Sequence, residues 1–407
     1  MMIDIHTMED DGLVTSFSKR HKVLALAMST VFIGSASAKA KVTTAVDVSE
    51  PLNSFTQAYR EYASAIRSGS SVIEELVDLA EQTYELGKAK FGSRHQNTFL
   101  LQQNLANAYL EAGEYELSAA HYETVIDYYD ETQGDDSQSF YFALLDIINL
   151  LYSADKAKKL SAEDIGIELY GCERAILQLF NTSEDLVAKM PESSLIFRAH
   201  TVKTAIRSKW SQKNTRLLNM AKQFQKEAKK SLGVASVTYL EAQLYVGKVQ
   251  LAMDRNKDAL LNFEAILEAT KLQGIYAPSI SLLAHAHLVT IYAKKKDAVK
   301  AIFHSQAAAK NGVWNDKHKA LYQVAPKLPK TKTTSSAASG TIDSVKLMFD
   351  ISSQGQAINI QIKDSSSQLK AKSAMTALKQ WYFVPKLVND AFLMTKGVEL
   401  TLDFVSA

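Results

Sequence analysis

Val345-Lys346-Leu347-Met348-Phe349-Asp350-Ile351 is the stretch that decides the fold of the C-terminal part of the chain. Apolar and polar side chains alternate along it, and this alternation predicts a β-strand with one buried face. The turn sequence Ser352-Ser353-Gln354-Gly355 follows, in which the glycine can adopt the positive φ that tight hairpins require. Ile358, Ile360 and Ile362 then alternate with polar residues and predict a second strand.

The chain after this hairpin changes from strand-like to helical spacing. A helix is predicted from about Ser367 to Tyr382, because its apolar residues fall on one side: Ala371, Ala374, Met375, Leu378 and Trp381. Pro385 lies just past the predicted end, where proline blocks continuation of a helix. A last alternation from Val398 to Phe404 predicts a closing strand. Residues 341–407 are therefore predicted to form a small α+β domain with the order ββαβ.

This segment resembles the C-terminal domain of the TonB family. The matching residues begin with the strand at 345–351, Gly355 and the run from Asn359 to Ile362. They continue with Ser365-Ser366, Ala374, Ala377-Leu378, the block Trp381-Tyr382-Phe383-Val384-Pro385 and the closing strand that ends in Phe404. The sequence departs from the family where Gln380 and Tyr382 flank the tryptophan, since basic residues are usual there. The Tyr-Pro pair usual just upstream is also missing.

The resemblance implies a partner and a binding edge. In TonB-like domains the last strand pairs with an extended segment of an outer-membrane receptor, so that exposed backbone groups supply affinity. By position, the edge implied here consists of Val398, Glu399, Leu400, Thr401, Leu402, Asp403, Phe404 and Val405. The family also implies energy-coupled transport across the outer membrane. For apolar residues such as Leu347, Phe349, Ile360 and Trp381, a purely structural role in the core is expected.

Length and charge narrow the class of protein. The chain has 407 residues, enough for two or three domains, and a formal net charge of +2, which does not favour nucleic-acid binding. Cys172 is its single cysteine, which excludes an internal disulfide and a metal site made of several cysteines.

The N-terminus has the parts of a secretory signal peptide. Lys19-Arg20-His21-Lys22 precedes an apolar run from Val23 to Ile33, and Ala36-Ser37-Ala38 follows as a cleavage site. The apolar run is shorter than the roughly 20 residues that span a bilayer. A signal peptide over residues 1–38 is therefore predicted, and the TonB resemblance implies export to the periplasm. If the segment is retained instead, the protein would be anchored in the inner membrane.

Residues 51–324 are predicted to form an array of repeated helix pairs. Gly92 and Gly134 are 42 residues apart, and an offset of 141 aligns Gly92 with Gly233. The same offset aligns Leu105, Ala106, Ser118 and Tyr122 with Val246, Gly247, Ala259 and Phe263. The unit from Asn104 to Tyr122 resembles a tetratricopeptide (TPR) repeat of the longer variety found in kinesin light chains. The sequence predicts five or six helix pairs.

Arrays of this type are solenoids whose concave face usually binds a peptide or protein. A spacer or a dimerisation surface is the alternative role for the repeats. Residues 325–340, which are rich in Lys, Thr, Ser and Pro, show no apolar periodicity and are predicted to be a flexible linker.

Motifs of enzymes are not found in the sequence. It contains no glycine-rich phosphate loop, no nucleophile elbow and no His-Glu-x-x-His. His285, His287 and His304 could suggest a metal site. However, His285 and His287 are two residues apart and point to different sides of a helix, so they cannot bind one metal ion together, and packing is expected for them. The prediction is a binding protein with no catalytic residues, metal, cofactor or small-molecule substrate.

Two functions are compatible with these features. In the first, the protein is a periplasmic member of the TonB family that contacts TonB-dependent outer-membrane receptors. Its repeats would then bind an inner-membrane motor complex or another periplasmic protein. In the second, the protein is a periplasmic TPR scaffold or adaptor with no connection to energy transduction.

Overall fold

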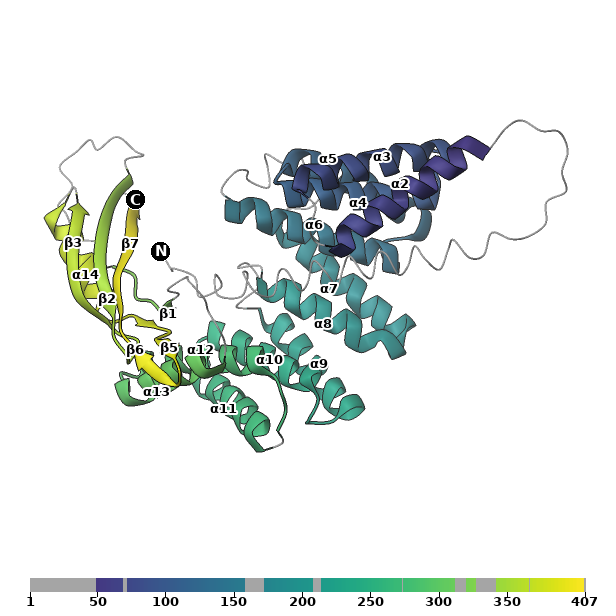
Figure 1. Cartoon of the computed structure of the whole chain (residues 1–407). Coiled ribbons are helices and arrows are strands. Elements are labelled where there is room, and N and C mark those ends of the chain that lie inside the picture. The colour runs from purple at the N-terminus through teal and green to yellow at the C-terminus, as the bar shows by residue number, and fades with distance from the viewer. Residues whose placement is uncertain are drawn as a thin grey trace, which may run out of the picture. The chain divides into compact units, whose positions relative to one another are not determined.

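The structure is a computed structural model (Figure 1) that describes residues 49–68, 72–157, 172–207, 214–272, 274–311, 320–326, 342–365 and 367–405. The chain divides into two compact units between Gln212 and Lys213. We call them the N-terminal and the C-terminal unit. The predicted signal peptide (1–38) lies outside the described residues, and so do residues 327–340 of the predicted linker.

The N-terminal unit consists of helices that pack against their neighbours in the chain. They are α2 (Ser49–Ser68), α3 (Ile73–Phe91), α4 (Gln96–Ala112), α5 (Tyr115–Gln133), α6 (Gln138–Ala157), α7 (Cys172–Lys189) and α8 (Ser194–Arg207), with a short 3₁₀ turn at Pro191–Ser193 before α8. In addition, α4 contacts α6, and α6 contacts α8. Helices α4, α6 and α8 therefore line one side of the stack, as the first helices of TPR-like pairs do.

The C-terminal unit begins with helices of the same kind. They are α9 (Thr215–Leu232), α10 (Val237–Ala252), α11 (Asn256–Leu272), α12 (Pro278–Lys294) and α13 (Ala298–Asn311). Here α10 contacts α12, in the same way as the alternate helices of the N-terminal unit. The chain thus contains a TPR-like helical array, in which α8 and α9 belong to different compact units.

The repeat in the sequence corresponds to a repeated loop. α3, α5 and α9 end at glycines with φ values of 95°, 83° and 80°, which are Gly92, Gly134 and Gly233. Three residues later, a side chain accepts a hydrogen bond from the first turn of the next helix; the acceptors are His95, Ser137 and Ser236. Glycine recurs because few other residues tolerate a positive φ. The offsets of 42 and 141 are therefore offsets between identical loops.

The turn inside each helix pair also repeats. Gly113, Asp254 and Lys296 follow the first helix at equivalent positions, with φ values of 76°, 59° and 59°. Close packing of the paired helices explains the small residues seen in the sequence. A Cβ atom on Gly247 would lie 2.7 Å from a ring carbon of Phe263, and both residues belong to the predicted repeat motif.

A three-stranded antiparallel sheet ends the chain. Its strands are β2 (Ile342–Ile351), β3 (Ala357–Ser365) and β7 (Thr395–Val405), in the spatial order β3-β2-β7. Helix α14 (Gln368–Leu378) contacts β2 and β3. The core beneath it contains Val345, Leu347, Phe349, Ala371, Ala374, Leu378 and Trp381. The predicted order of strand, strand, helix and strand is present.

Four short strands that were not predicted also occur. They are β1 (Ala320–Tyr322), β4 (Tyr382–Phe383), β5 (Lys386–Val388) and β6 (Ala391–Leu393). The predicted helix end at Tyr382 is wrong, because α14 ends at Leu378. Its last turn tightens when the N–H of Trp381 bonds to the carbonyl of Leu378, and Tyr382 and Phe383 then pair with β1.

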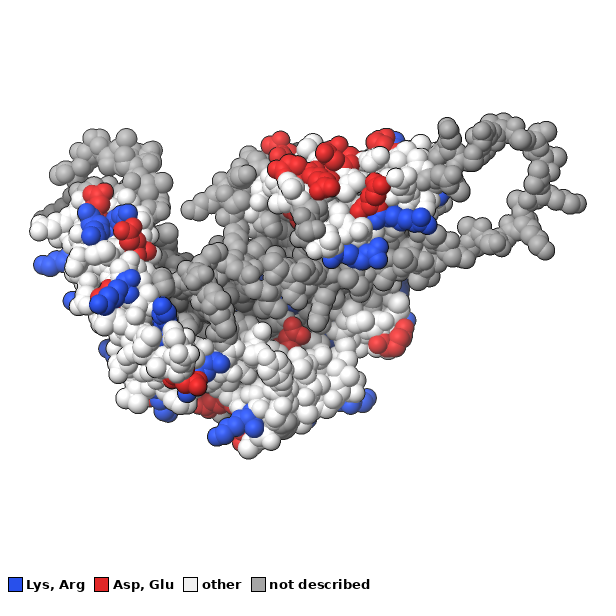
Figure 2. Space-filling model, in the orientation of Figure 1, with Lys and Arg blue, Asp and Glu red and all other residues white. Residues whose placement is uncertain are grey.

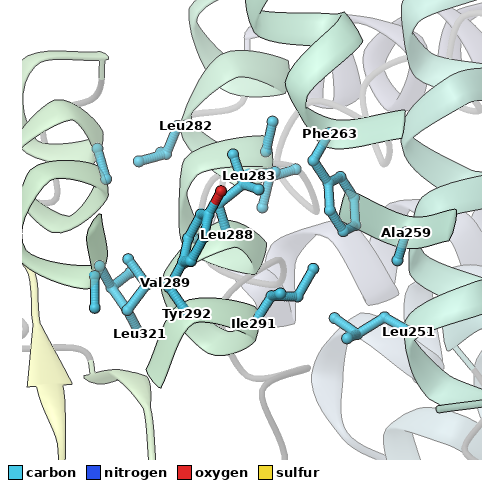
Figure 3. Packing of buried hydrophobic residues seen from close by; sticks show 14 of the residues in the cluster. Leu251, Ala259, Phe263, Leu282, Leu283, Leu288, Val289, Ile291, Tyr292 and Leu321 are labelled. Carbon is cyan, nitrogen blue, oxygen red and sulfur yellow. The ribbon is translucent and has the colours of Figure 1, made fainter. Parts of the chain in front are cut away.

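The segment at 320–324 joins the sheet to the helical array. Leu321 is fully buried in the array's core beside Val289 and Tyr292 (Figure 3), and its carbonyl accepts a hydrogen bond from Thr290 Oγ1 at 3.2 Å. The indole N–H of Trp381 donates to the carbonyl of Val324 at 2.9 Å. Residues 320–324 therefore contact both the helical array and the segment that contains Trp381 and β4.

A contact from α13 completes this attachment. Ser305 Oγ donates to the carbonyl of Phe383 at 2.7 Å, and Gln306 Nε2 donates to the carbonyl of Ser353 at 3.1 Å. Tyr382 packs into the same core cluster as Leu321. The sheet and the last helix pair therefore share buried side chains and hydrogen bonds.

Candidate interaction surfaces

The predicted binding edge corresponds to one continuous strand. All eight of its residues, from Val398 to Val405, lie in β7 and pair one to one with β2 from Phe349 back to Ile342. Among the described residues, β2 is the one strand that pairs with β7. The other side of β7 therefore carries backbone groups without a strand partner in this part of the chain.

Side chains alternate along β7 as the sequence predicts. Val398, Leu402 and Phe404 are buried in the sheet's core, whereas Glu399 and Thr401 are exposed. On the exposed face, Glu399 forms an ion pair with Lys346 of β2 at 2.8 Å. The hydrogen bond from Lys346 lowers the pKa of Glu399 and raises that of Lys346.

The two outer strands of the sheet differ in regularity. The pairing of β2 with β3 is interrupted twice within nine residues of β3, between Lys346 and Leu347 and between Met348 and Asp350. Asn359, at the second interruption, has a φ of 52°. Bulges of this kind protect an edge against pairing with further strands. The stretch of β7 from Val398 to Val405 has no such interruption, so it is the edge suited to strand addition.

Asp350 on the central strand β2 accepts hydrogen bonds from both outer strands, at Asn359 in β3 and at Gly397 in β7. Its Oδ1 accepts from the backbone N–H of Gly397 at 2.9 Å, and its Oδ2 accepts from Asn359 Nδ2 at 2.8 Å. These hydrogen bonds, the one from Asn359 first, lower the pKa of Asp350. Gly397, with a φ of 70°, lies at the point where the pairing of β7 with β2 becomes regular. No sequence signal identified this residue.

A second surface lies on the even-numbered helices of the N-terminal unit. Half-buried residues recur on α4, α6 and α8 at helical spacing, and they form three parallel stripes. The stripe on α4 contains Gln103 and Asn107, that on α6 contains Asp146 and Asn149, and that on α8 contains His200, Lys203 and Arg207. We call these three stripes the inner face. Asn107 and Asn149 are 42 residues apart, the same spacing that separates Gly92 from Gly134.

Contacts across the stripes show that they are in register. Gln103 Nε2 donates to Asp146 Oδ2 at 2.6 Å, which joins α4 to α6. The guanidinium of Arg207 donates to Asn149 Oδ1 at 3.1 Å and lies 4.9 Å from the ring of Tyr152, which joins α6 to α8.

Asp146 on α6 is the carboxyl group among these residues. Its side chain is half-buried, and desolvation raises its pKa to about 7, against the lowering effect of the hydrogen bond from Gln103.

The other side of the same unit is acidic. Asp and Glu side chains gather over α3 and α5 (Figure 2). A shallow hollow there is lined by Arg94, Phe99, Glu123, Thr124, Asp127, Tyr128 and Glu131. Phe99 and Tyr128 stack at its wall, and burial together with Glu131 and Asp130 raises the pKa of Asp127.

The histidines noted in the sequence lie in the array's core. His285 and His304 contact each other, with their Nδ1 atoms 2.9 Å apart, and His287 stacks on Phe263. Burial lowers the pKa of both His285 and His304 to about 4. Within the described ranges, no group of three or more His, Cys, Asp or Glu residues is placed to hold a metal ion.

No described helix is both long and apolar enough to cross a membrane.

Comparisons with known proteins gave matches among solved structures alone. No protein-family profile matches the chain, and no curated protein matches it. Two crystal structures of a putative kinesin light chain from Podosopora anserina, with nearly identical TPR-like repeats, are similar to it. One is 15% identical with a TM-score of 0.40, covering 56% of this chain and 97% of that chain. The other is 16% identical with a TM-score of 0.40, covering 55% and 97%.

Proposed function

We propose that this chain is a periplasmic protein-binding protein of the TonB type, in which the outer edge of β7 accepts an extended segment of a TonB-dependent outer-membrane receptor. The TPR-like array, a type of structure that commonly binds proteins, would hold a second partner. That partner would be an inner-membrane motor complex or another periplasmic protein. The observation that carries this proposal is the uninterrupted run of β7 from Val398 to Val405.

Strand addition fits the chemistry of that edge. A segment that pairs with β7 would gain backbone hydrogen bonds along the run, and its alternate side chains would meet Glu399 and Thr401 on the exposed face. Bulged β3 offers no comparable run. The proposal therefore predicts binding at one edge of the sheet.

A proline substitution at this edge tests the mechanism. Successive N–H groups of a strand point to opposite sides, so either Thr401 or Leu400 presents its N–H to the open edge. Proline at that position removes the donor and should weaken binding by about tenfold or more, with the fold intact. Proline at the other position removes a backbone hydrogen bond between β7 and β2, so this variant should have a lower free energy of unfolding. The measurement is fluorescence anisotropy with the full chain and a labelled peptide from the N-terminal segment of a receptor.

The alternative function is a periplasmic TPR scaffold unconnected with energy transduction. Under this alternative the receptor peptide does not bind the full chain at all. If the peptide binds and both folded variants, Thr401→Pro and Leu400→Pro, keep the affinity of the natural sequence, pairing at β7 is refuted.

A further inference from the structure

We propose that one edge of the C-terminal unit binds the surface of a membrane that contains anionic lipids. This edge consists of the last turns of α9 and α11, the loops that follow these two helices and the first residue of α10. We call it the loop edge. It is separate from the outer edge of β7, and the proposal does not depend on the function proposed for β7.

The two loops of the loop edge lie at the same end of their helices. Short loops join α9 to α10 and α11 to α12, and such loops leave consecutive helices antiparallel. α9 and α11 therefore end where α10 and α12 begin. Because α10 also contacts α12, the two loops occupy neighbouring positions, about 8–10 Å apart at the spacing of packed helices. A flat surface can touch both loops at once.

Large apolar side chains project from this edge. Tyr276 is 89% exposed and Leu272 is 73% exposed, both at the end of α11 or in the loop after it. Leu232, Val234 and Val237 are exposed around the loop after α9. A single exposed apolar side chain is ordinary on a protein surface, whereas several on neighbouring loops indicate an interaction site.

The repeated loop does not require apolar residues at these positions. The residue after the glycine with positive φ is Ser93 in the loop after α3, Asp135 in the loop after α5 and Val234 in the loop after α9. All three side chains are exposed. Tyr276 lies 42 residues after Val234, which is the offset of the repeat. The backbone thus accepts polar residues here, so Val234 and Tyr276 are not explained by the turn.

The charge of the loop edge complements anionic lipid. Residues 228–237 and 269–278 contain three lysines and no acidic residue. The lysines are Lys229, Lys230 and Lys271, and all are exposed in the last turns of α9 and α11. The acidic side chain that precedes them on α11 is Glu268, one turn before Leu272. Anionic headgroups attract lysines near the surface, and this attraction adds to the insertion of neighbouring apolar side chains.

The shape of the edge favours a bilayer over an acidic protein. A folded protein would need a fitted groove for each of the side chains that project from the two loops. A fluid bilayer accepts such side chains without a fitted groove, since apolar groups enter about 5–10 Å into the boundary between headgroups and acyl chains. Tyrosine suits this depth, because its ring can be buried while its hydroxyl stays among the headgroups.

The test is cosedimentation of the full chain with lipid vesicles. Binding should saturate on vesicles with about one third phosphatidylglycerol and should be at least tenfold weaker on pure phosphatidylcholine. Leu272→Gln should weaken binding at least fivefold. Its matched control is Leu261→Gln, near the start of the same helix at a position that is 65% exposed, which should change binding less than twofold. All of these side chains are exposed, so the thermal midpoint should stay unchanged.

A second pair of variants tests the charge. Lys271→Glu should also weaken binding at least fivefold. Lys257→Glu makes the same change about 21 Å away along α11, which exceeds the Debye length of about 8 Å at physiological salt, and its effect should stay below twofold.

Insertion is measured with Tyr276→Trp. Phospholipids brominated in their acyl chains should quench the indole added by this substitution, beyond the quenching seen with the natural chain. The indole added by Leu261→Trp should not be quenched.

Four results would overturn the proposal. They are no binding to the anionic vesicles, equal losses from Leu272→Gln and Leu261→Gln, no added quenching in Tyr276→Trp, and displacement from the vesicles by soluble polyglutamate at equal charge, which would assign the edge to an acidic protein. Thr401→Pro should leave vesicle binding unchanged, so failure here and failure at β7 can be distinguished.

Discussion

Leu321→Ala tests whether the sheet and the last repeats form one cooperative structure. The side chain of Leu321 is fully buried in the core of the helical array, although the residue belongs to a strand that pairs with β4. If a flexible linker separated the two parts near this position, shortening the side chain would have little effect. In the structure, the change removes buried apolar surface from the boundary between them.

The expected magnitude follows from the burial of the side chain. Leu→Ala at a fully buried position costs about 2–5 kcal/mol, because transfer energy is lost and a cavity remains. For a unit of this size, each kcal/mol lowers the melting temperature by roughly 2–4 °C. A loss of about 3 kcal/mol would therefore lower the midpoint of the C-terminal unit by roughly 6–12 °C.

Thermal and urea unfolding followed by circular dichroism measure this change, and hydrogen exchange locates it. We expect faster exchange both in α12 and in β4, because both lose contacts with the residue. The matched control is Leu272→Ala, since Leu272 is 73% exposed in α11 and should contribute less than about 1 kcal/mol. The reasoning is refuted if Leu321→Ala matches this control, or if only one of the two parts exchanges faster.

Two further predictions concern the repeats. Lys296→Gly should raise the free energy of unfolding, measured in urea titrations, by about 1 kcal/mol. Lys296 has a φ of 59°, a value that glycine adopts more easily, and Gly113 occupies the equivalent position in another turn. No gain in stability would contradict this prediction. Lowering the pH from about 7 to about 4 should destabilise the C-terminal unit. Burial lowers the pKa of His285 and His304 from 6.5 to about 4, so the unfolded chain binds more protons in this range. The pH dependence of the urea midpoint should flatten in His285→Gln, and an unchanged slope would contradict this assignment.

The sequence allowed the helical array to be predicted because its loops repeat. Gly92, Gly134 and Gly233 occupy the same turn, in which φ is positive, so their spacing is visible without coordinates. The prediction of a TPR-like array is confirmed by the helix pairs. The TonB resemblance and the receptor partner stay predictions.

The attachment of the sheet could not be predicted from the sequence. β1 has three residues, too few to show an alternation, and its partner strand is about 60 residues later in the chain. The alternation in β3 was also misleading, because the bulge at Asn359 changes the face on which Ile358 lies relative to Ile360. Asp350 gave no signal, since a polar residue on the exposed face of a strand is ordinary.

The position of β1 changes what residues 327–341 do for the molecule. The residues on both sides of this segment lie in the C-terminal unit, where β1 pairs with β4 and β2 pairs with β3 and β7, so the segment does not connect two separate bodies. Doubling the length of a flexible loop costs only about 0.6 kcal/mol. Insertions there would therefore alter neither the distance nor the orientation between array and sheet. A protease that cuts there would leave two fragments held together by Leu321, Trp381 and the strand pairing of β1 with β4.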